Sequence, residues 1–263
     1  MTLLESGFPL SAAISPRLQV IETVDSTNAA LVRHVTDDPE AHPHLSVLLT
    51  RDQRAGRGRR DRTWTTPPGS ALAVSVVLDV GAVAVDDRGW IPLLAGAAMT
   101  RAVGRQLSRF RADLKWPNDV MVEGRKICGI LAEVVAADPN LVVVGAGVNT
   151  AMPAGELPVP TATSFHALGA SAEEDRLLAD YLTHLRDDIA ALAVSGSAAV
   201  RPAVEEHCAT LGTHVRVTLP DETTVVGQAQ RLDDGGRLVV LTDGGDELVL
   251  AAGDVVHIRP DEG

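Results

Sequence analysis

Six arginines and two glycines lie within twelve residues of the sequence, between positions 51 and 62. Glycine at positions 56 and 58 lets the backbone approach a ligand closely and adopt positive φ at little cost. Arginine stays protonated and offers a planar fork that matches phosphate or carboxylate oxygens. The segment predicts an anion-binding loop, and a solvated basic loop is the alternative that this stretch alone leaves open. Because six like charges repel one another, we expect the loop to become ordered only when an anion neutralises it.

Trp64 follows this loop directly in a chain of which only 3% is aromatic. An indole ring is a flat apolar platform for a purine base, and such stacking stabilises binding by about 1–3 kcal/mol per base. A core or lid residue is the alternative interpretation. An anion-binding loop beside an aromatic platform indicates a nucleotide site.

The chain contains 21 arginines but only two lysines, Lys115 in "LKWPND" and Lys126 in "GRKICGI". An ammonium group is a compact point charge on a flexible stem, whereas guanidinium is a broad fork. We infer that both positions require ammonium, although a codon bias toward arginine also explains the scarcity. Asn118 and Asp119 offer the oxygen donors that hard cations prefer, in a composition that a generic turn shares.

Several other kinds of site are absent from the sequence. "VVVGAGVNT" has Gly145 and Gly147 but lacks the third glycine and the helix of a dinucleotide-binding fingerprint, so we expect a strand-end turn that presents Asn149. The histidines lack the spacing of a zinc site, and no nucleophile elbow is present. Positive charge, backbone amides and an aromatic platform without a covalent nucleophile suit activation of a substrate by ATP.

The chain that must position these groups has 263 residues, enough for one large domain and one small one. Its formal net charge of −12 argues against general binding to nucleic acid or to an anionic membrane. No apolar run approaches the ~20 residues of a membrane helix, and the N-terminus lacks the positive region of a signal peptide. We therefore expect a cytoplasmic protein in which Cys128 and Cys208 are reduced thiols.

Hydrophobic periodicity predicts a large domain over residues 1–208 and a small β domain over residues 209–263. Strands are expected at 17–24, 45–53 and 71–80 and in "DLKWPNDVMV", "KICGILAEVVA" and "LVVVGAGVNT". Helices are expected in "DSTNAALVRHV", with Ser26 at its N-cap, and at 90–110, 173–193 and 197–208. Five short strands joined by Asp/Gly turns follow Leu211, which indicates a small barrel or sandwich.

Five motifs, in this order, resemble the biotin protein ligase family: "DSTN" (25–28), "DQRAGRGRRDRTW" (52–64), "KWPND" (115–119), "GRKICGILAE" (124–133) and "GAGVN" (145–149). The resemblance implies an α+β fold, with a class II synthetase-like mixed sheet packed with helices and a C-terminal SH3-like β-barrel. It implies two steps. Biotin attacks the α-phosphate of ATP, giving biotinoyl-AMP and pyrophosphate. A lysine of a biotin carboxyl carrier domain, typically of acetyl-CoA carboxylase, then takes the biotinyl group.

The resemblance also assigns residues to roles. Biotin is expected to contact Ser26, Thr27, Gln53, Gly56, Arg57, Lys126, Gly129 and Leu131. ATP and the adenylate are expected to contact Arg57, Arg59, Arg62, Trp64, Lys115, Asn118, Lys126 and Asn149. The catalytic residues are expected to be Lys126, Arg59, Arg62, Asn118 and Asp119, with Lys126 bridging the biotin carboxylate and the α-phosphate and with Asn118 and Asp119 as magnesium ligands.

Two features set this chain apart from the family pattern. Asp61 stands where the family loop usually has glycine; we expect it to pair with a neighbouring arginine and Asp61→Gly to tighten retention of biotinoyl-AMP. About sixteen residues precede the first expected strand, too few for the helix-turn-helix domain of family members that act as repressors. This absence and the acidic composition lead us to expect no binding to nucleic acid or membrane. The resemblance implies a monomer or weak homodimer, since the family includes both monomers and dimers. A lipoate ligase and a non-catalytic sensor or regulator are the rival functions.

Overall fold

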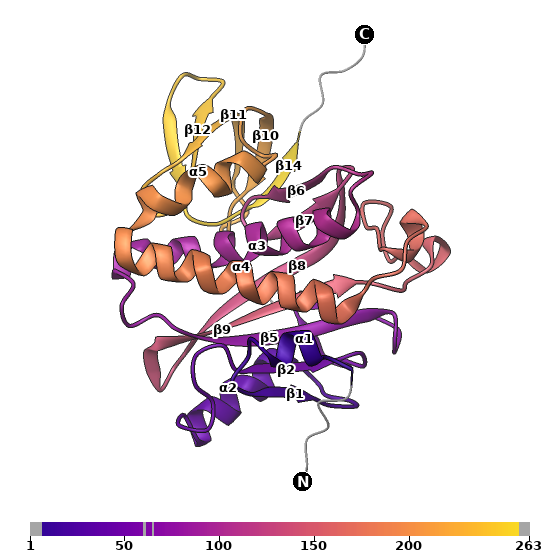
Figure 1. The fold of residues 1–263 in the computed structure, drawn as a ribbon. Helices are drawn as coiled ribbons and strands as arrows, with labels where there is room; N and C mark the ends of the chain where they lie inside the picture. The colour runs from indigo at the N-terminus through magenta and orange to yellow at the C-terminus, as the bar shows by residue number, and fades with distance from the viewer. Residues whose placement is uncertain (1–6, 60–61, 65, 258–263) are drawn as a thin grey trace.

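A seven-stranded mixed sheet forms the centre of the computed structural model, which describes residues 7–59, 62–64 and 66–257 (Figure 1). Its strands are β1 (Leu18–Val20), β2 (Val47–Thr50), β5 (Ala71–Asp79), β6 (Ala112–Lys115), β7 (Asp119–Val122), β8 (Arg125–Val135) and β9 (Asp138–Asn149). Their order is β1-β2-β5-β9-β8-β7-β6, with β1 and β2 parallel and all other pairs antiparallel. The predicted α+β class is confirmed. The expected effect of Asp61 lies outside the described residues.

Helices cover both faces of this sheet because its central strands are apolar on both sides. α3 (Ile91–Gln106) and α4 (Glu174–Ser195) lie on one face, and α2 (Thr27–Asp37) lies on the other (Figure 1). Along β5, Val76 belongs to the large hydrophobic cluster under α3, and the next residue, Val77, belongs to the small cluster under α2. The remaining helical segments are α1 (Pro9–Ala12), α5 (Ser197–His207) and 3-10 turns at Val85–Trp90, Ala154–Glu156 and His166–Leu168.

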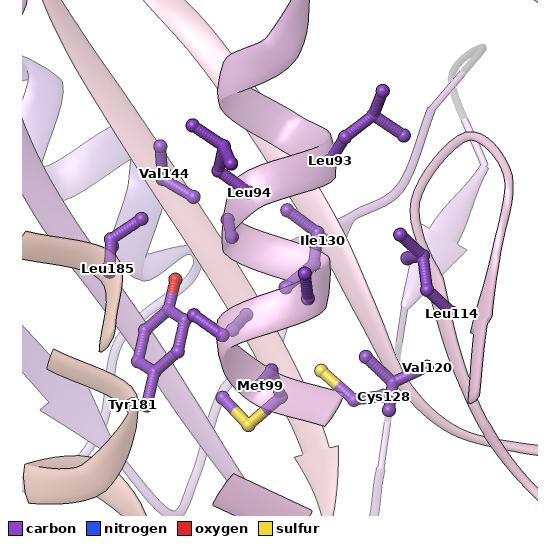
Figure 2. Packing of buried hydrophobic residues seen from close by; sticks show 14 of the residues in the cluster. Leu93, Leu94, Met99, Leu114, Val120, Cys128, Ile130, Val144, Tyr181 and Leu185 are labelled. Carbon is purple, nitrogen blue, oxygen red and sulfur yellow. The ribbon is translucent and has the colours of Figure 1, made fainter. Parts of the chain in front are cut away.

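The large cluster joins α3, α4 and the sheet into one core. Met99 of α3 and Tyr181 of α4 lie close together over the sheet (Figure 2). Cys128 is buried in the same core, and both Cys128 and Cys208 are free thiols. None of the described helices combines the length and the hydropathy that a membrane crossing requires.

The C-terminal part is a five-stranded antiparallel sheet, which confirms the five short strands expected there. Its strands are β10 (His214–Thr218), β11 (Thr224–Leu232), β12 (Leu238–Thr242), β13 (Glu247–Leu250) and β14 (Asp254–His257), in the order β13-β12-β11-β10-β14. Two tryptophans of the larger domain donate indole hydrogen bonds to its β11–β12 turn: Trp90 to the Asp234 carbonyl at 2.7 Å and Trp116 to the Gly236 carbonyl at 3.2 Å. A division of the chain at 208/209 remains a prediction.

Three sequence-based expectations about strands need correction. "DLKWPNDVMV" forms two antiparallel strands, β6 and β7, because Pro117 between them has no N–H to donate to a ladder. The expected first strand, 17–24, contains only the three residues of β1. Gly145 and Gly147 are not in a strand-end turn but inside β9.

Candidate active site

The floor of the candidate site is a patch of mostly small residues on three neighbouring strands, β5, β9 and β8. Two rows of lateral neighbours make this floor, Ala73, Gly147 and Gly129 in one row and Ser75, Gly145 and Leu131 in the next. Above it lies a cavity of about 840 Å³, including its open mouth, on the face of the sheet that carries α2. Small side chains on the floor give the cavity its depth.

The two glycines of "GAGVN" make room for neighbouring side chains. A Cβ on Gly145 would lie 2.3 Å from Oδ1 of Asn28, and a Cβ on Gly147 would lie 2.7 Å from Cζ2 of Trp64. Both distances are shorter than any ordinary carbon contact. Close approach of a side chain, rather than a turn, therefore explains why β9 has glycine at both positions.

One end of the cavity is a hydrogen-bonded group of uncharged side chains, which we call the neutral end: Ser26, Thr27, Asn28, Gln53 and Ser75. Gln53 Oε1 accepts hydrogen bonds from the Thr27 backbone amide at 2.8 Å and from Thr27 Oγ1 at 3.0 Å. Ser75 Oγ lies 2.8 Å from Thr27 Oγ1 and 2.6 Å from Asn28 Oδ1. Because both bonds to Gln53 use its oxygen, Nε2 is the part of this carboxamide left for a ligand.

The start of α2 fixes the neutral end to the sheet. Ser26 caps the helix, as the sequence predicted, by accepting a 3.3 Å bond from the Ala29 amide. Asn28 Nδ2 donates to the Leu131 carbonyl at 3.1 Å and to Glu133 at 2.8 Å. Buried amides that are bonded at both ends hold one orientation.

The arginine segment crosses the cavity as a short hairpin of β3 (Gly56–Arg57) and β4 (Thr63–Trp64), which we call the arginine hairpin. A Cβ on Gly56 would lie 2.2 Å from the Trp64 carbonyl oxygen and 2.3 Å from Gln53 Nε2. Glycine at this position therefore allows the hairpin to approach Gln53. This contact places the arginine hairpin directly beside the neutral end.

The other end of the cavity, the cationic end, consists of Arg57, Arg59, Arg62 and Lys126 with their partners. The pairs are Arg57 with Glu133 (2.9 Å), Arg59 Nη1 with Asn118 Oδ1 (3.0 Å), Lys126 Nζ with Asp119 Oδ1 (2.5 Å), and Arg62 with Asp254. The side chains of Arg57 and Arg62 are 48% and 66% exposed. Exposed ion pairs contribute only about 0–1 kcal/mol, so these cations can exchange partners readily.

A β-bulge directs Lys126 into the cavity. The β7–β8 register shifts between Val120, which faces Cys128, and Met121, which faces Lys126, so Ile127 is the extra residue. Without the bulge, alternation would place Lys126 on the opposite face from Gly129. With it, a Cβ on Gly129 would lie 3.1 Å from Lys126 Nζ, and the ammonium stands on the cavity floor.

Neighbouring backbone holds Lys126 in this position. Its amide donates to the Thr161 carbonyl at 2.7 Å, and its carbonyl accepts from the Thr163 amide at 2.8 Å. The other lysine, Lys115, is partly buried at the end of β6. Burial lowers the pKa of Lys115, the charge of Lys126 also lowers it, and the carboxylates of Asp119 and Asp254 act in the opposite direction.

Most of the residues predicted from the sequence meet at this cavity. Those that line it are Ser26, Thr27, Gln53, Arg57, Arg59, Arg62, Trp64, Asn118, Asp119, Lys126, Gly129 and Leu131. Gly56, Lys115 and Asn149 do not belong to its lining. Asn149, expected to face adenine, is buried and donates from Nδ2 to the Thr163 carbonyl at 2.9 Å.

Sequence reasoning missed three residues with clear contacts at the site. Asn28 belongs to the "DSTN" motif, so the motif could have identified it. Nothing in the sequence indicated the residues that its buried amide contacts. Glu133 closes the "GILAE" motif and pairs with Arg57. Asp254 lines the cavity from the small β domain and belongs to none of the motifs, so no sequence signal identified it. No described group of three or more His, Cys, Asp and Glu side chains is arranged to hold a metal ion.

Solved structures share this fold. The biotin protein ligase of Aquifex aeolicus, in complex with biotin and ATP, superposes with a TM-score of 0.77 at 22% identity over 92% of this chain and 100% of that one. The Leishmania major enzyme, in complex with biotinyl-5-AMP, gives a TM-score of 0.62 at 23% identity over 90% of this chain and 99% of that one. The fold is therefore that of the biotin protein ligases.

Sequence comparison goes further. Residues 20–149 match the model of the biotin/lipoate A/B protein ligase family, and residues 210–258 match the biotin protein ligase C terminal domain. The Mycobacterium tuberculosis biotin–[acetyl-CoA-carboxylase] ligase is 38% identical over 247 residues, which are 92% of this chain and 90% of that protein. The chain belongs to the biotin protein ligase family.

Proposed function

We propose that this enzyme activates biotin with ATP and transfers it to a lysine of the carrier domain of acetyl-CoA carboxylase. The observation that carries the proposal is that the Lys126 ammonium and the Trp64 indole stand on neighbouring parts of the floor of one cavity. The Lys126 ammonium and the Trp64 indole stand on Gly129 and Gly147, which are lateral neighbours on β8 and β9. A carboxylate held at the lysine would lie beside an adenosine stacked on the indole.

The neutral end suits the ring system of biotin. A ureido group is uncharged and carries one carbonyl and two N–H groups, so it needs fixed donors and acceptors rather than charge. Gln53 Nε2 and the hydroxyls of Ser26 and Thr27 offer these at the cavity wall. Because Thr27 and Gln53 already bond to each other, little side-chain freedom is lost when the ligand binds.

The cationic end suits the first step. A biotin carboxylate oxygen attacks the α-phosphorus of ATP, the new O–P bond forms, and the bond to pyrophosphate breaks. Both reactants are anions, so their approach requires positive charge at the junction. Lys126, Arg59 and Arg62 supply it, and no covalent nucleophile of the protein is required.

The second step consumes the mixed anhydride. The neutral amine of the acceptor lysine attacks the biotinyl carbonyl carbon. An amide bond forms as the nitrogen releases a proton to solvent, and AMP leaves with the electron pair of the broken C–O bond. Water competes with the amine for the same carbon. The arginine hairpin lies across the cavity, where it limits the access of water to the adenylate.

Magnesium fits the site as an ion that arrives with ATP. Asn118 and Asp119 line the cavity, but Asn118 Oδ1 accepts from Arg59 and Asp119 pairs with Lys126. Magnesium commonly uses one or two carboxylates together with substrate phosphates and water. We propose that Asp119 and Asn118 contribute oxygen donors to such an ion, which neutralises phosphate charge when bound.

The cellular setting is also a proposal. Two free buried thiols, Cys128 and Cys208, suit the reducing cytoplasm. A monomer or weak homodimer without a nucleic-acid partner remains our expectation, supported by the formal net charge of −12.

Pyrophosphate release from ATP tests the proposed function directly. We expect release that requires both biotin and magnesium, with lipoate in place of biotin giving only background. Mass spectrometry of the same mixture should detect biotinyl-AMP, and adding a biotin carboxyl carrier domain should convert it to AMP and biotinylated carrier. Pyrophosphate release that depends on lipoate would indicate a lipoate ligase instead. Binding of biotin and ATP without release of pyrophosphate would indicate a non-catalytic sensor.

A further inference from the structure

Asp254 brings the small β domain to the wall of the catalytic cavity. It is the first residue of β14 and pairs with Arg62 of the arginine hairpin, 192 positions earlier in the sequence. Both residues line the cavity together with Lys126 and Trp64. Nothing in the reaction described above uses Asp254.

The backbone of Asp254 is held firmly. It lies opposite Thr218 in the β10–β14 ladder, and the next residue, Val255, is buried. The indole bonds from Trp90 and Trp116 to the β11–β12 turn attach this sheet to the larger domain. The carboxylate therefore projects from a support that is fixed relative to the cavity floor.

The side chain of Arg62, in contrast, is not held by packing. It is 66% exposed, and the backbone bonds of Arg62, from the Gly58 amide to the Arg62 carbonyl at 2.6 Å and from the Arg62 amide to the Arg59 carbonyl at 3.3 Å, do not fix its guanidinium. An exposed arginine has many rotamers of similar energy. Its carboxylate partner therefore decides where the guanidinium lies.

We propose that Asp254 is a positioning residue, which holds Arg62 and the end of the arginine hairpin across the cavity so that ATP is bound and the adenylate is retained. This inference rests on the proposed function. A guanidinium has five N–H donors on several edges, so Arg62 can bond to the Asp254 carboxylate and to a phosphate at the same time. Asp254 then need not be displaced when ATP binds.

The alternative is that Asp254 only occupies Arg62 until a phosphate replaces it. The two roles predict opposite signs. If Asp254 positions Arg62, its removal weakens ATP binding. If it competes with phosphate, its removal strengthens ATP binding. The rigid support of Asp254 and its place in the cavity wall favour positioning.

Asp254→Asn keeps the shape of the side chain and removes its charge. We expect the KM for ATP and the rate of biotinyl-AMP release to rise up to about fivefold, as the loss of one exposed charge pair implies, with a smaller change in kcat. Asp254→Glu should restore most of the retention. In an Arg62→Ala background, Asp254→Asn should have no further effect on adenylate release.

Glu247→Gln is the matched control, because it removes the exposed Arg231–Glu247 pair of the same small sheet, away from the cavity. It should leave adenylate release unchanged. Hydrogen exchange of residues 56–64 without ligand provides a second readout, and we expect faster exchange in Asp254→Asn but not in Glu247→Gln. If the wild-type chain made no biotinyl-AMP, the proposed function would fail. The exchange measurement would still show whether Asp254 holds Arg62 and the arginine hairpin in place. Unchanged release and exchange in Asp254→Asn, or tighter ATP binding, would overturn the inference.

Discussion

The two ends of the cavity are stabilised by different interactions, buried hydrogen bonds at the neutral end and exposed ion pairs at the cationic end. At the neutral end, Thr27, Asn28 and Ser75 are buried and bonded to one another, and none of them can titrate. At the cationic end, Arg57 and Arg62 are 48% and 66% exposed and depend on carboxylates from other elements. The first arrangement is costly to rearrange, because a buried polar group left without its partner costs about 1–3 kcal/mol. The second is easily rearranged.

This difference matches what each end must do. An uncharged ring with fixed hydrogen-bonding groups is recognised best by a site that is already in place. Phosphate groups bring charge and change during the reaction, so the cations that contact them must be able to adjust their contacts. The neutral end therefore provides selectivity, and the cationic end provides the charge stabilisation of the chemical step.

The largest expected effect follows from removing the ammonium of the cationic end. Lys126→Gln keeps the length of the stem but not its charge. We expect the rate of biotinyl-AMP formation to fall about 10²–10³-fold, the usual result of deleting one electrostatic contact to a reacting centre. Single-turnover pyrophosphate release measures it.

The affinity for biotin serves as the internal control for Lys126→Gln. Because the neutral end is intact in this variant, biotin affinity measured by calorimetry should fall by less than about tenfold. An equal loss in biotin binding and in rate would mean that the two ends are not separable.

Gly145→Ala tests the neutral end. The added methyl group would lie 2.3 Å from Asn28 Oδ1, so Asn28 must move and its bond with Ser75 must break. Overpacking of this kind costs about 1–3 kcal/mol, and we expect biotin affinity to fall about tenfold while the KM for ATP at saturating biotin stays within about twofold. Gly155→Ala is the matched control, because a Cβ there meets nothing within 4 Å. Normal biotin binding by Gly145→Ala would contradict the rigid neutral end.

Salt should separate the two ends without any substitution. Between 0.05 M and 0.5 M salt the Debye length falls to about a third, which screens the exposed pairs of the cationic end. We expect the dissociation constant for ATP to rise about three- to fivefold and that for biotin to change by less than about twofold. Parallel titrations by calorimetry measure both, and similar slopes for the two ligands would remove the distinction.

The sequence predicted well those parts of the site that are local in the chain. Ser26 was recognised as a helix cap because capping depends on neighbouring residues. Gly129 was expected at the ligand site because of its motif, and it lies in the cavity lining. The role of Gly145 was misread, because a glycine inside a strand looks like a turn until the approaching Asn28 is known.

The parts that escaped prediction depend on contacts between distant segments. Asp254 meets Arg62 because the small β sheet docks on the larger domain, through contacts that include the indole bonds of Trp90 and Trp116, and no local pattern encodes that docking. The bulge at Ile127 escaped for a related reason, since it is defined by the register with β7 and not by β8 alone. Sequence motifs identified the chemical groups, whereas tertiary packing determined which of them meet.

The smallest expected effect concerns Lys115, which lies near the cationic end but outside the cavity lining. Burial is the main reason why the pKa of Lys115 lies below its ordinary value of 10.5. A lysine loses its charge as the pH rises through its pKa, so Lys115 loses its charge at a lower pH than an exposed lysine does. We expect the KM for ATP to rise about threefold on the alkaline side, because one nearby but screened charge is removed.

Lys115→Arg, whose guanidinium stays charged, isolates this contribution to the pH profile. The variant should shift the alkaline rise in the KM for ATP to higher pH and leave the pH dependence of biotin affinity unchanged, because the neutral end holds no titratable side chain. Stopped assays from pH 7 to about pH 10 measure both. If Lys115→Arg altered the biotin curve as strongly as the ATP curve, the charge of Lys115 would act on both ends, and the boundary between them would have to be drawn elsewhere.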